Sequence, residues 1–413
     1  MKIGSATFNR LSIFISVILL FPCLMYVEAG PIAEGSVKFL GNIAQGTPAS
    51  NYADYWNQVT LENGGKWGRV QPSQSSFDWK ATDSAYEYCR TNGFPYKHHC
   101  FVWGSQYPNW ITGLSAADQK AAVENWIKTY GERFPETEFI DVVNEPLTTA
   151  CPFKEALGGD GTSGWDWVIT SFELARQYCP NAKLLINEYN IVNSISYAVG
   201  YLGIVKLLQA KNLIDGIGIQ SHCFNVQGTP VANIKKSLDT LASSGLPLYP
   251  SEFDITGDQT AQLNDYKMYF PIFWEHPAVE GVTLWGWTNN WKGGIIMSGT
   301  TEYLALKWLR TYVDSLEQTK LKRTEVPKDK GADISVVTDR AGRGSISLNT
   351  LNAGAVLLRI VDVRGRTIFS QDERFSGKGN HLISFPASSL GKGIYAVRIT
   401  GERFSIGRKM VID

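Results

Sequence analysis

The feature that most constrains this fold is an alternation of short apolar runs with longer amphipathic segments between about residues 37 and 316. The apolar runs have the length of buried strands and lie at residues 37–44, 58–60, 96–103, 139–144, 183–187, 214–220, 246–249 and 281–287. Segments with helical periodicity follow most of them, at residues 116–134, 166–178, 196–211, 231–243, 262–274 and 302–316. In the first of these segments Val123, Trp126, Ile127 and Tyr130 share one helical face.

Repeated strand-then-helix units of this kind predict a (β/α)8 barrel over residues 30–316. The alternative is an open doubly wound sheet, which would place a glycine-rich phosphate loop after its first strand. The sequence there, Phe39-Leu40-Gly41-Asn42-Ile43, contains no such loop. We therefore expect the barrel.

The amino-acid composition changes after the predicted barrel. Residues 317–333 are charged and contain few apolar side chains, which is typical of a linker. Residues 334–413 contain short alternating runs separated by glycine-containing turns, and they predict a small all-β sandwich. This segment has no cluster of histidine, aspartate or glutamate, so we assign it no chemistry.

The amino-terminal residues 1–29 are typical of a secretory signal peptide. A positive start (Lys2, Arg10) precedes an apolar run and a small residue, Ala29. The alternative is a single membrane anchor, because the run approaches spanning length. Cleavage would leave an exported protein with no stable membrane insertion. Five cysteines would remain, with no C-x-x-C spacing to indicate a zinc or redox site and no pattern that assigns disulfide pairs.

The charge balance argues against some partners. Lysine plus arginine equals aspartate plus glutamate at 39 each, and the chain has no basic block. Binding to nucleic acid or to an anionic membrane surface is therefore not expected.

Polar side chains lie where the predicted strands end, which is where barrel enzymes carry their active sites. Glu145 follows the fourth strand and Glu252 follows the seventh. A single glutamate at a strand end often caps a loop or pairs with a lysine. Two carboxylates facing one site are what glycoside hydrolysis uses, one protonated to act as an acid and one ionised to attack. The other strand ends add amide, imidazole, ammonium and indole groups, which suit a sugar ligand.

These strand ends resemble glycoside hydrolase family 10, the endo-β-1,4-xylanases, over nearly the whole barrel. The matching pieces are residues 59–63 (VTLEN), Lys66-Trp67, His99 with Trp103, and residues 143–146 (VNEP), 187–190 (NEYN), 220–222 (QSH), 251–255 (SEFDI) and 285–286 (WG). Each piece alone is a weak signal. Their order and spacing across eight strands make the resemblance specific.

The resemblance implies a role for each matching position. Glu145 would be the acid/base and Glu252 the nucleophile, with retention of anomeric configuration. His222, supported by Asp254, would hold Glu252. The substrate-binding residues would be Glu62, Asn63, Lys66, His99, Trp103, Asn144, Tyr189, Gln220, His222, Trp285 and Trp291, with Asn144 on the 2-hydroxyl and the two tryptophans forming a wall. No metal and no cofactor is implied.

Some positions depart from the family pattern. The family commonly has a second histidine after the strand-three tryptophan, where this chain has Gly104, and the segment from Trp285 to Trp291 is short. Residues 358–369 (LRIVDVRGRTIF) and the stretch near the carboxyl end resemble a type A sorting domain of the type IX secretion system, although the usual Pro-Asn-Pro opening is missing. Residues 334–413 would then be a transport tag that engages the secretion machinery.

The sequence therefore predicts a secreted, retaining endo-1,4-β-xylanase that cleaves xylan or xylo-oligosaccharides through a covalent glycosyl-enzyme intermediate. One alternative keeps the chemistry but acts on another β-1,4-glycan, such as cellulose or mixed-linkage glucan. A second is a metal-dependent barrel hydrolase using His98, His99 and His222. A third is a non-catalytic carbohydrate-binding protein.

Overall fold

The computed structural model describes residues 30–288, 294–324, 332–338, 344–350, 354–362, 367–386, 390–391, 393–401 and 404–412. The predicted signal peptide, residues 1–29, and the predicted wall residue Trp291 lie outside this described part. None of the described helices combines the length and apolarity needed to cross a bilayer.

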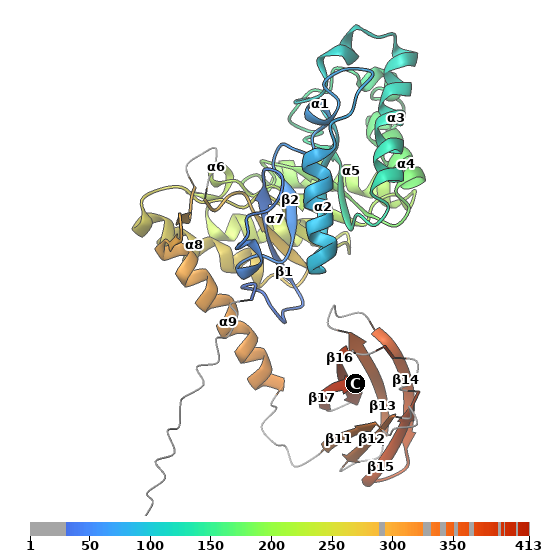
Figure 1. Ribbon diagram of the computed structural model, residues 1–413, viewed down its shortest axis with the longest axis vertical. Helices are drawn as coiled ribbons and strands as arrows, with labels where there is room; N and C mark the ends of the chain where they lie inside the picture. Colours follow the sequence, from blue (N-terminus) through green and yellow to red (C-terminus); the bar gives the residue numbers. More distant parts are fainter. Residues whose placement is uncertain are drawn as a thin grey trace, which may run out of the picture.

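Eight parallel strands form the barrel, with the order β7-β6-β5-β4-β3-β2-β1-β8, so the predicted (β/α)8 fold is confirmed (Figure 1). The strands are β1 (Phe39–Ala44), β2 (Val59–Leu61), β3 (Tyr96–Trp103), β4 (Phe139–Asn144), β5 (Lys183–Glu188), β6 (Gly216–Ile219), β7 (Leu248–Pro250) and β8 (Gly281–Leu284). Backbone hydrogen bonds close the ring between β7 and β8: Leu248 donates to Ala278 at 2.8 Å, and Phe253 donates to Thr283 at 2.9 Å.

The helices cover the outside of the barrel (Figure 1). The longer ones are α2 (Lys80–Asn92), α3 (Ala116–Arg133), α4 (Asp166–Tyr178), α5 (Ile195–Gln209), α7 (Val231–Ala242), α8 (Gln259–Trp274) and α9 (Leu304–Thr324). Short helices α1 (Trp67–Val70), α6 (Cys223–Val226) and η3 (Lys154–Leu157) lie in the connections. The predicted face of α3 is buried as expected. Sequence analysis did not identify α2, which buries Thr82, Ala85, Tyr86 and Cys89 along an otherwise polar helix.

The barrel interior changes character along its axis. Near the amino ends of the strands an apolar cluster of Phe139, Leu185 and Tyr249, with Phe39 packed against it, fills the bottom. Higher up, buried polar side chains occupy the interior. Lys97 and His99 of β3 contact Asp141 Oδ2 of β4 at 3.2 and 2.9 Å. Apolar packing thus fills the barrel near the amino ends of its strands, and polar side chains fill it toward the carboxyl ends.

The carboxyl-terminal strands form two antiparallel sheets, which confirms the small all-β sandwich. One sheet contains β11 (Ala332–Thr338), β12 (Gly344–Thr350) and β15 (Gly379–Phe385), and the other contains β14 (Thr367–Phe375), β13 (Gly354–Asp362), β16 (Gly393–Gly401) and β17 (Phe404–Ile412). Their shared core includes Ile346, Leu348, Leu358, Ile360 and Val397. Because α9 continues to Thr324 and β11 begins at Ala332, part of the predicted linker 317–333 is regular structure. The exact domain limits stay a prediction.

The five described cysteines, Cys89, Cys100, Cys151, Cys179 and Cys223, are all buried, and no disulfide joins any two of them. Burial raises the pKa of the Cys151 and Cys179 thiols to about 12. A buried thiol that stays protonated is a poor nucleophile and packs as a small apolar group.

His98 faces the space between β3 and α3. Its ring lies 4.0 Å from the Tyr130 ring and also packs against Phe101 and Trp126. Among the described residues neither ring nitrogen of His98 has a hydrogen-bond partner. Burial lowers the pKa of His98 well below its ordinary value of 6.5, so the folded protein holds this ring neutral.

We predict that His98→Leu leaves the melting temperature unchanged or slightly raised at pH 7.5 and raises it at pH 5.5 by roughly 2–4 °C. Below about pH 6.5 the unfolded chain takes up a proton on His98 that the folded chain does not. The unfolded state then binds more protons, so His98 makes the free energy of unfolding fall as the pH falls. Thermal melts of both proteins at the two pH values measure this, and an equal loss of melting temperature at both would contradict it.

Candidate active site

Glu145 is the residue immediately after β4, and its backbone turns sharply there. Its φ of 58° lies in the left-handed region, which a non-glycine residue adopts only when its surroundings hold it. The half-buried carboxylate accepts three hydrogen bonds: from Trp103 Nε1 at 2.8 Å, from Thr149 Oγ1 at 2.6 Å and from Gln220 Nε2 at 2.9 Å. The side chain is therefore fixed in one orientation at the carboxyl end of the barrel.

Glu252 follows β7 and is almost completely buried, with 3% of its surface exposed. Its Oε1 accepts a hydrogen bond from Asn187 Nδ2 at 2.7 Å, and its Oε2 lies 3.1 Å from His222 Nε2. Burial alone would raise the pKa of Glu252. The hydrogen bond from His222 and the nearby charges of His99 and Lys97 outweigh burial and lower that pKa to about 2. Glu252 is thus ionised at neutral pH.

The backbone ladder explains why two glutamates so distant in sequence meet. Beyond the strand ends Glu145 N–H donates to Asn187 at 2.8 Å, Gln220 N–H donates to Glu188 at 2.9 Å, and Glu252 N–H donates to Gln220 at 2.9 Å. These bonds place successive residues of β4, β5, β6 and β7 side by side along one rim. Parallel strands end at the same edge, so the register alone brings the side chains together.

A network of amides connects the two carboxylates. Asn187 Nδ2 donates both to Glu252 Oε1 at 2.7 Å and to Asn144 Oδ1 at 2.9 Å. Gln220 Nε2 donates to Glu145 Oε1 at 2.9 Å and makes a longer contact of 3.4 Å with Asn144 Oδ1. Asn144 Oδ1 thus accepts from both sides, and no described residue accepts a hydrogen bond from the Asn144 NH2 group.

His222 and Asp254 support Glu252 from behind. His222 Nδ1 lies 3.4 Å from Asp254 Oδ1, which also accepts the backbone N–H of Cys223 at 2.6 Å. Burial opposes a charge on His222. Its hydrogen bonds with Asp254 and Glu252 outweigh burial and raise its pKa to about 9. The imidazolium therefore carries a proton on each nitrogen and pairs with a carboxylate on either side.

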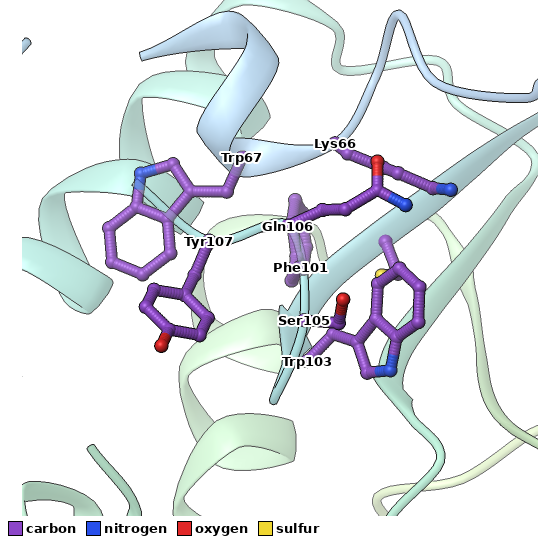
Figure 2. A pocket seen from close by; sticks show the side chains of 8 residues that line it. Lys66, Trp67, Phe101, Trp103, Ser105, Gln106 and Tyr107 are labelled. Atoms are coloured by element: carbon purple, nitrogen blue, oxygen red, sulfur yellow. The ribbon is translucent and has the colours of Figure 1, made fainter. Parts of the chain in front are cut away.

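Lys66 and Trp103 line a small hollow together with Gln106 and Tyr107 (Figure 2). Lys66 Nζ donates to Asn63 Oδ1 at 3.1 Å and lies 5.0 Å from the centre of the Trp103 ring. Burial lowers the pKa of Lys66. In Figure 2 the ends of the Lys66 and Gln106 side chains lie on the same side as the Trp103 indole. Glu62 is half-buried next to this group and accepts a hydrogen bond from Gln45.

Aromatic rings cover the nucleophile side. The indole of Trp285 packs edge-on against His99 at 5.5 Å and against His222 at 6.1 Å. Tyr189 is half-buried and meets Phe224 at 6.1 Å, while Phe224 stacks on His222 at 5.2 Å with 49% of its surface exposed. The structure thus brings the predicted site residues that it describes to one rim of the barrel.

Sequence reasoning missed several residues that hold this site. Asn187 joins the two carboxylates but was noticed only as part of a matching motif. Glu188 accepts Leu147 N–H at 2.8 Å and Thr148 Oγ1 at 2.7 Å, and burial raises the pKa of Glu188 to about 7. Thr149 contacts Glu145, although nothing marks it in the sequence. A position at the end of strand five was the only available signal, and it pointed to Asn187 and Glu188 alone.

His98, which the metal-dependent alternative needs, lies outside the site, packed against α3. Within the described ranges no group of three or more histidine, cysteine, aspartate or glutamate side chains has the arrangement of a metal site.

Comparison with known proteins adds two family matches. Residues 31–305 match the model of glycosyl hydrolase family 10, and residues 342–413 match the model of the secretion system C-terminal sorting domain. The second match indicates export, to the medium or to the cell surface.

Individual relatives agree with the first match. Endo-1,4-beta-xylanase B of Cellvibrio japonicus is 38% identical over 281 residues, covering 66% of this chain and 45% of that protein. This chain thus spans less than half of that relative's length. An endo-1,4-beta-xylanase of Agaricus bisporus is 30% identical over 269 residues, covering 62% of this chain and 80% of that protein.

Among solved structures, native xylanase 10B from Thermotoga maritima shares the fold, with a TM-score of 0.62 at 22% identity over 70% of this chain and 98% of that one. The family model spans well over half of the 413 residues and includes every strand of the barrel. The chain therefore belongs to glycosyl hydrolase family 10.

Proposed function

We propose that this protein is a retaining endo-1,4-β-xylanase that cleaves xylan by double displacement. The observation that carries the proposal is the pair of carboxylates, Glu145 and Glu252, joined through the amides of Asn144, Asn187 and Gln220 at one rim of the barrel. Two carboxylates in one site, of which one is held ionised, match the requirements of glycoside hydrolysis with a covalent intermediate.

Glu252 suits the role of nucleophile. Its carboxylate attacks the anomeric carbon, and the bond from that carbon to the leaving oxygen breaks as Glu145 supplies the proton. The pKa of about 2 means that Glu252 needs no deprotonation before attack. The imidazolium of His222 and the amide of Asn187 aim its two oxygens. In the second step Glu145, now ionised, removes a proton from water, and the water oxygen displaces Glu252 from the sugar.

Asn144 suits recognition of the 2-hydroxyl. Its oxygen is occupied by Asn187 and Gln220, so its NH2 group is presented as a donor beside both carboxylates. A donor that binds more tightly as charge develops on the sugar stabilises the transition state more than the bound substrate. Glu62, Asn63, Lys66, His99 and Trp103 would bind the glycone sugar hydroxyls and ring face, with Trp285 as a wall. Tyr189 would contact substrate from the other side of the carboxylates.

The choice of xylan as substrate is supported by the relatives, which are named endo-1,4-beta-xylanases. Product analysis on xylan, cellulose and mixed-linkage glucan tests it directly. Xylo-oligosaccharide products from xylan, with little release from the two glucans, are expected. Faster turnover of a glucan would replace xylan as the substrate and leave the two-carboxylate chemistry unchanged.

We predict that Glu252→Ala lowers kcat on xylan by more than about a thousandfold, because no group remains to form the covalent intermediate. Glu87→Ala, which removes an exposed carboxylate of α2, is the matched control and should keep the wild-type rate. Far-UV circular dichroism verifies that both variants are folded. Wild-type rates in a folded Glu252→Ala protein would refute the nucleophile assignment.

We predict that Glu145→Ala lowers kcat/KM on xylan by roughly 10²–10⁴-fold, the usual contribution of general acid catalysis. An aryl β-xyloside with an activated leaving group needs little protonation, so its kcat/KM should fall much less. Steady-state kinetics on both substrates measure the contrast. Equal losses on the two would count against an acid role for Glu145.

We further propose that residues 334–413 serve transport and take no part in hydrolysis. Removing them should leave kcat and KM on soluble xylan within about twofold of the full chain, because the sandwich has its own core and the site is built on residues that follow strands of the barrel. Secretion of the truncated chain from a host with the matching export system should fail. Loss of hydrolysis in a folded truncated protein would show that the barrel depends on the sandwich.

A further inference from the structure

We infer that Thr149 positions the carboxyl group of Glu145, and that the bare backbone of Gly104 is what lets Thr149 reach it. The inference rests on the proposed function, because it gives the Thr149 hydroxyl a part in the proton transfer proposed for Glu145. In the sequence Gly104 is only a departure from the family pattern, and Thr149 carries no mark at all.

The hydrogen bonds of Glu145 divide its carboxyl oxygens into a held oxygen and an open one. Oε2 accepts from Trp103 Nε1 at 2.8 Å and from Thr149 Oγ1 at 2.6 Å. Among the described residues Oε1 accepts from Gln220 Nε2 alone, at 2.9 Å. Each oxygen has two lone pairs in the carboxyl plane. Oε2 is therefore saturated, and Oε1 keeps one open position through which a proton can pass to the leaving oxygen. Thr149 fixes the rotation that aims Oε1.

Hydrogen bonds to Glu145 and to Glu188 hold the segment that carries Thr149 in place. Thr149 N–H donates to the carbonyl of Glu145 at 3.0 Å. The two preceding residues bind Glu188 at the end of β5, Leu147 through its N–H at 2.8 Å and Thr148 through its hydroxyl at 2.7 Å. Adjacent threonines thus bind two different carboxylates. Because the backbone is already ordered, the Thr149 hydroxyl loses little conformational freedom when it binds Glu145.

Gly104 supplies the space for the other end of this segment. A Cβ added at residue 104 would lie 2.6 Å from the carbonyl carbon of Ala150 and 3.0 Å from the backbone nitrogen of Cys151. Both are main-chain atoms, so neither can move aside by a change of rotamer as the end of a flexible side chain can. Any side chain at 104 would push back residues 150 and 151, and Thr149 directly precedes them. The missing side chain and the threonine contact are therefore parts of one arrangement.

Two substitutions at residue 149 separate the hydroxyl from the shape of the side chain. Thr149→Val keeps the branched shape and removes the hydroxyl, whereas Thr149→Ser keeps the hydroxyl and removes the methyl group. Both are compared with wild type on a xylo-oligosaccharide and on an aryl β-xyloside with an activated leaving group. Thr240→Val is the matched control, because the exposed Thr240 hydroxyl only donates to the carbonyl of Lys236 within α7.

Thr149→Val should lower kcat on the xylo-oligosaccharide roughly ten- to a hundredfold, with KM nearly unchanged, because the lost hydrogen bond strengthens as Glu145 gives up its proton and becomes charged. Its kcat/KM on the activated aryl substrate should fall much less, because that substrate needs little acid catalysis. Thr149→Ser and Thr240→Val should stay within about twofold of wild type. Equal losses on both substrates, or better function with valine than with serine, would show that Thr149 only packs the loop and would overturn the inference.

Gly104→Ala tests whether the bare backbone of Gly104 is needed for Thr149 to reach Glu145. It should show the same substrate contrast as Thr149→Val, and the double variant should lose no more than the worse single variant, within about twofold. Losses that multiply in the double variant would show that Gly104 acts independently of Thr149. Thermal melts verify that each variant is folded. If Gly104→Ala does not fold, Thr149→Val and Thr149→Ser still test the role of Thr149. A wild-type protein inactive on both the xylo-oligosaccharide and the aryl β-xyloside would instead refute the proposed function.

Discussion

The site depends on keeping one carboxylate charged inside the barrel mouth. An ion removed from water is costly unless it is paired and hydrogen-bonded. Glu252 meets this condition through the imidazolium of His222 on one oxygen and the amide of Asn187 on the other, and Asp254 compensates the second proton of His222. Lys97 and His99, clustered around Asp141 below, add positive potential from the barrel floor. The arrangement of β3 to β7 is what brings these partners within reach.

The barrel supplies that environment by dividing its interior into two layers. Apolar packing of Phe139, Leu185 and Tyr249 closes the bottom and keeps water from entering there. The upper layer is polar, and hydrogen bonds from Asn187, His222 and Gln220 hold Glu252 and Glu145 in place before any substrate arrives. Groups held in this way need little rearrangement when charge develops on a bound sugar, which is the physical basis of electrostatic preorganisation. Stability and chemistry thus occupy opposite ends of the same strands.

Much of this arrangement could be predicted because local sequence patterns indicate it. Strand-length apolar runs predicted the barrel, and the motifs at the ends of β4 and β7 predicted Glu145 and Glu252. Helix α2 was not predicted because its buried stripe is short and most of its residues are polar or charged. The link between Thr149 and Gly104 could not be predicted, because it arises only when two loops pack together. No periodicity or spacing along the chain encodes a contact between the residue after β3 and a turn after β4.

The five buried thiols have a consequence for life outside the cell. An exported chain meets oxidants, yet the described cysteines gain their protection from packing alone, without any cross-link to lock the barrel shut. Each opening of the fold large enough to uncover one of them exposes it to irreversible damage or to a wrong partner. The extent of cysteine oxidation in aged enzyme would therefore report how often the barrel has opened locally since the protein was exported.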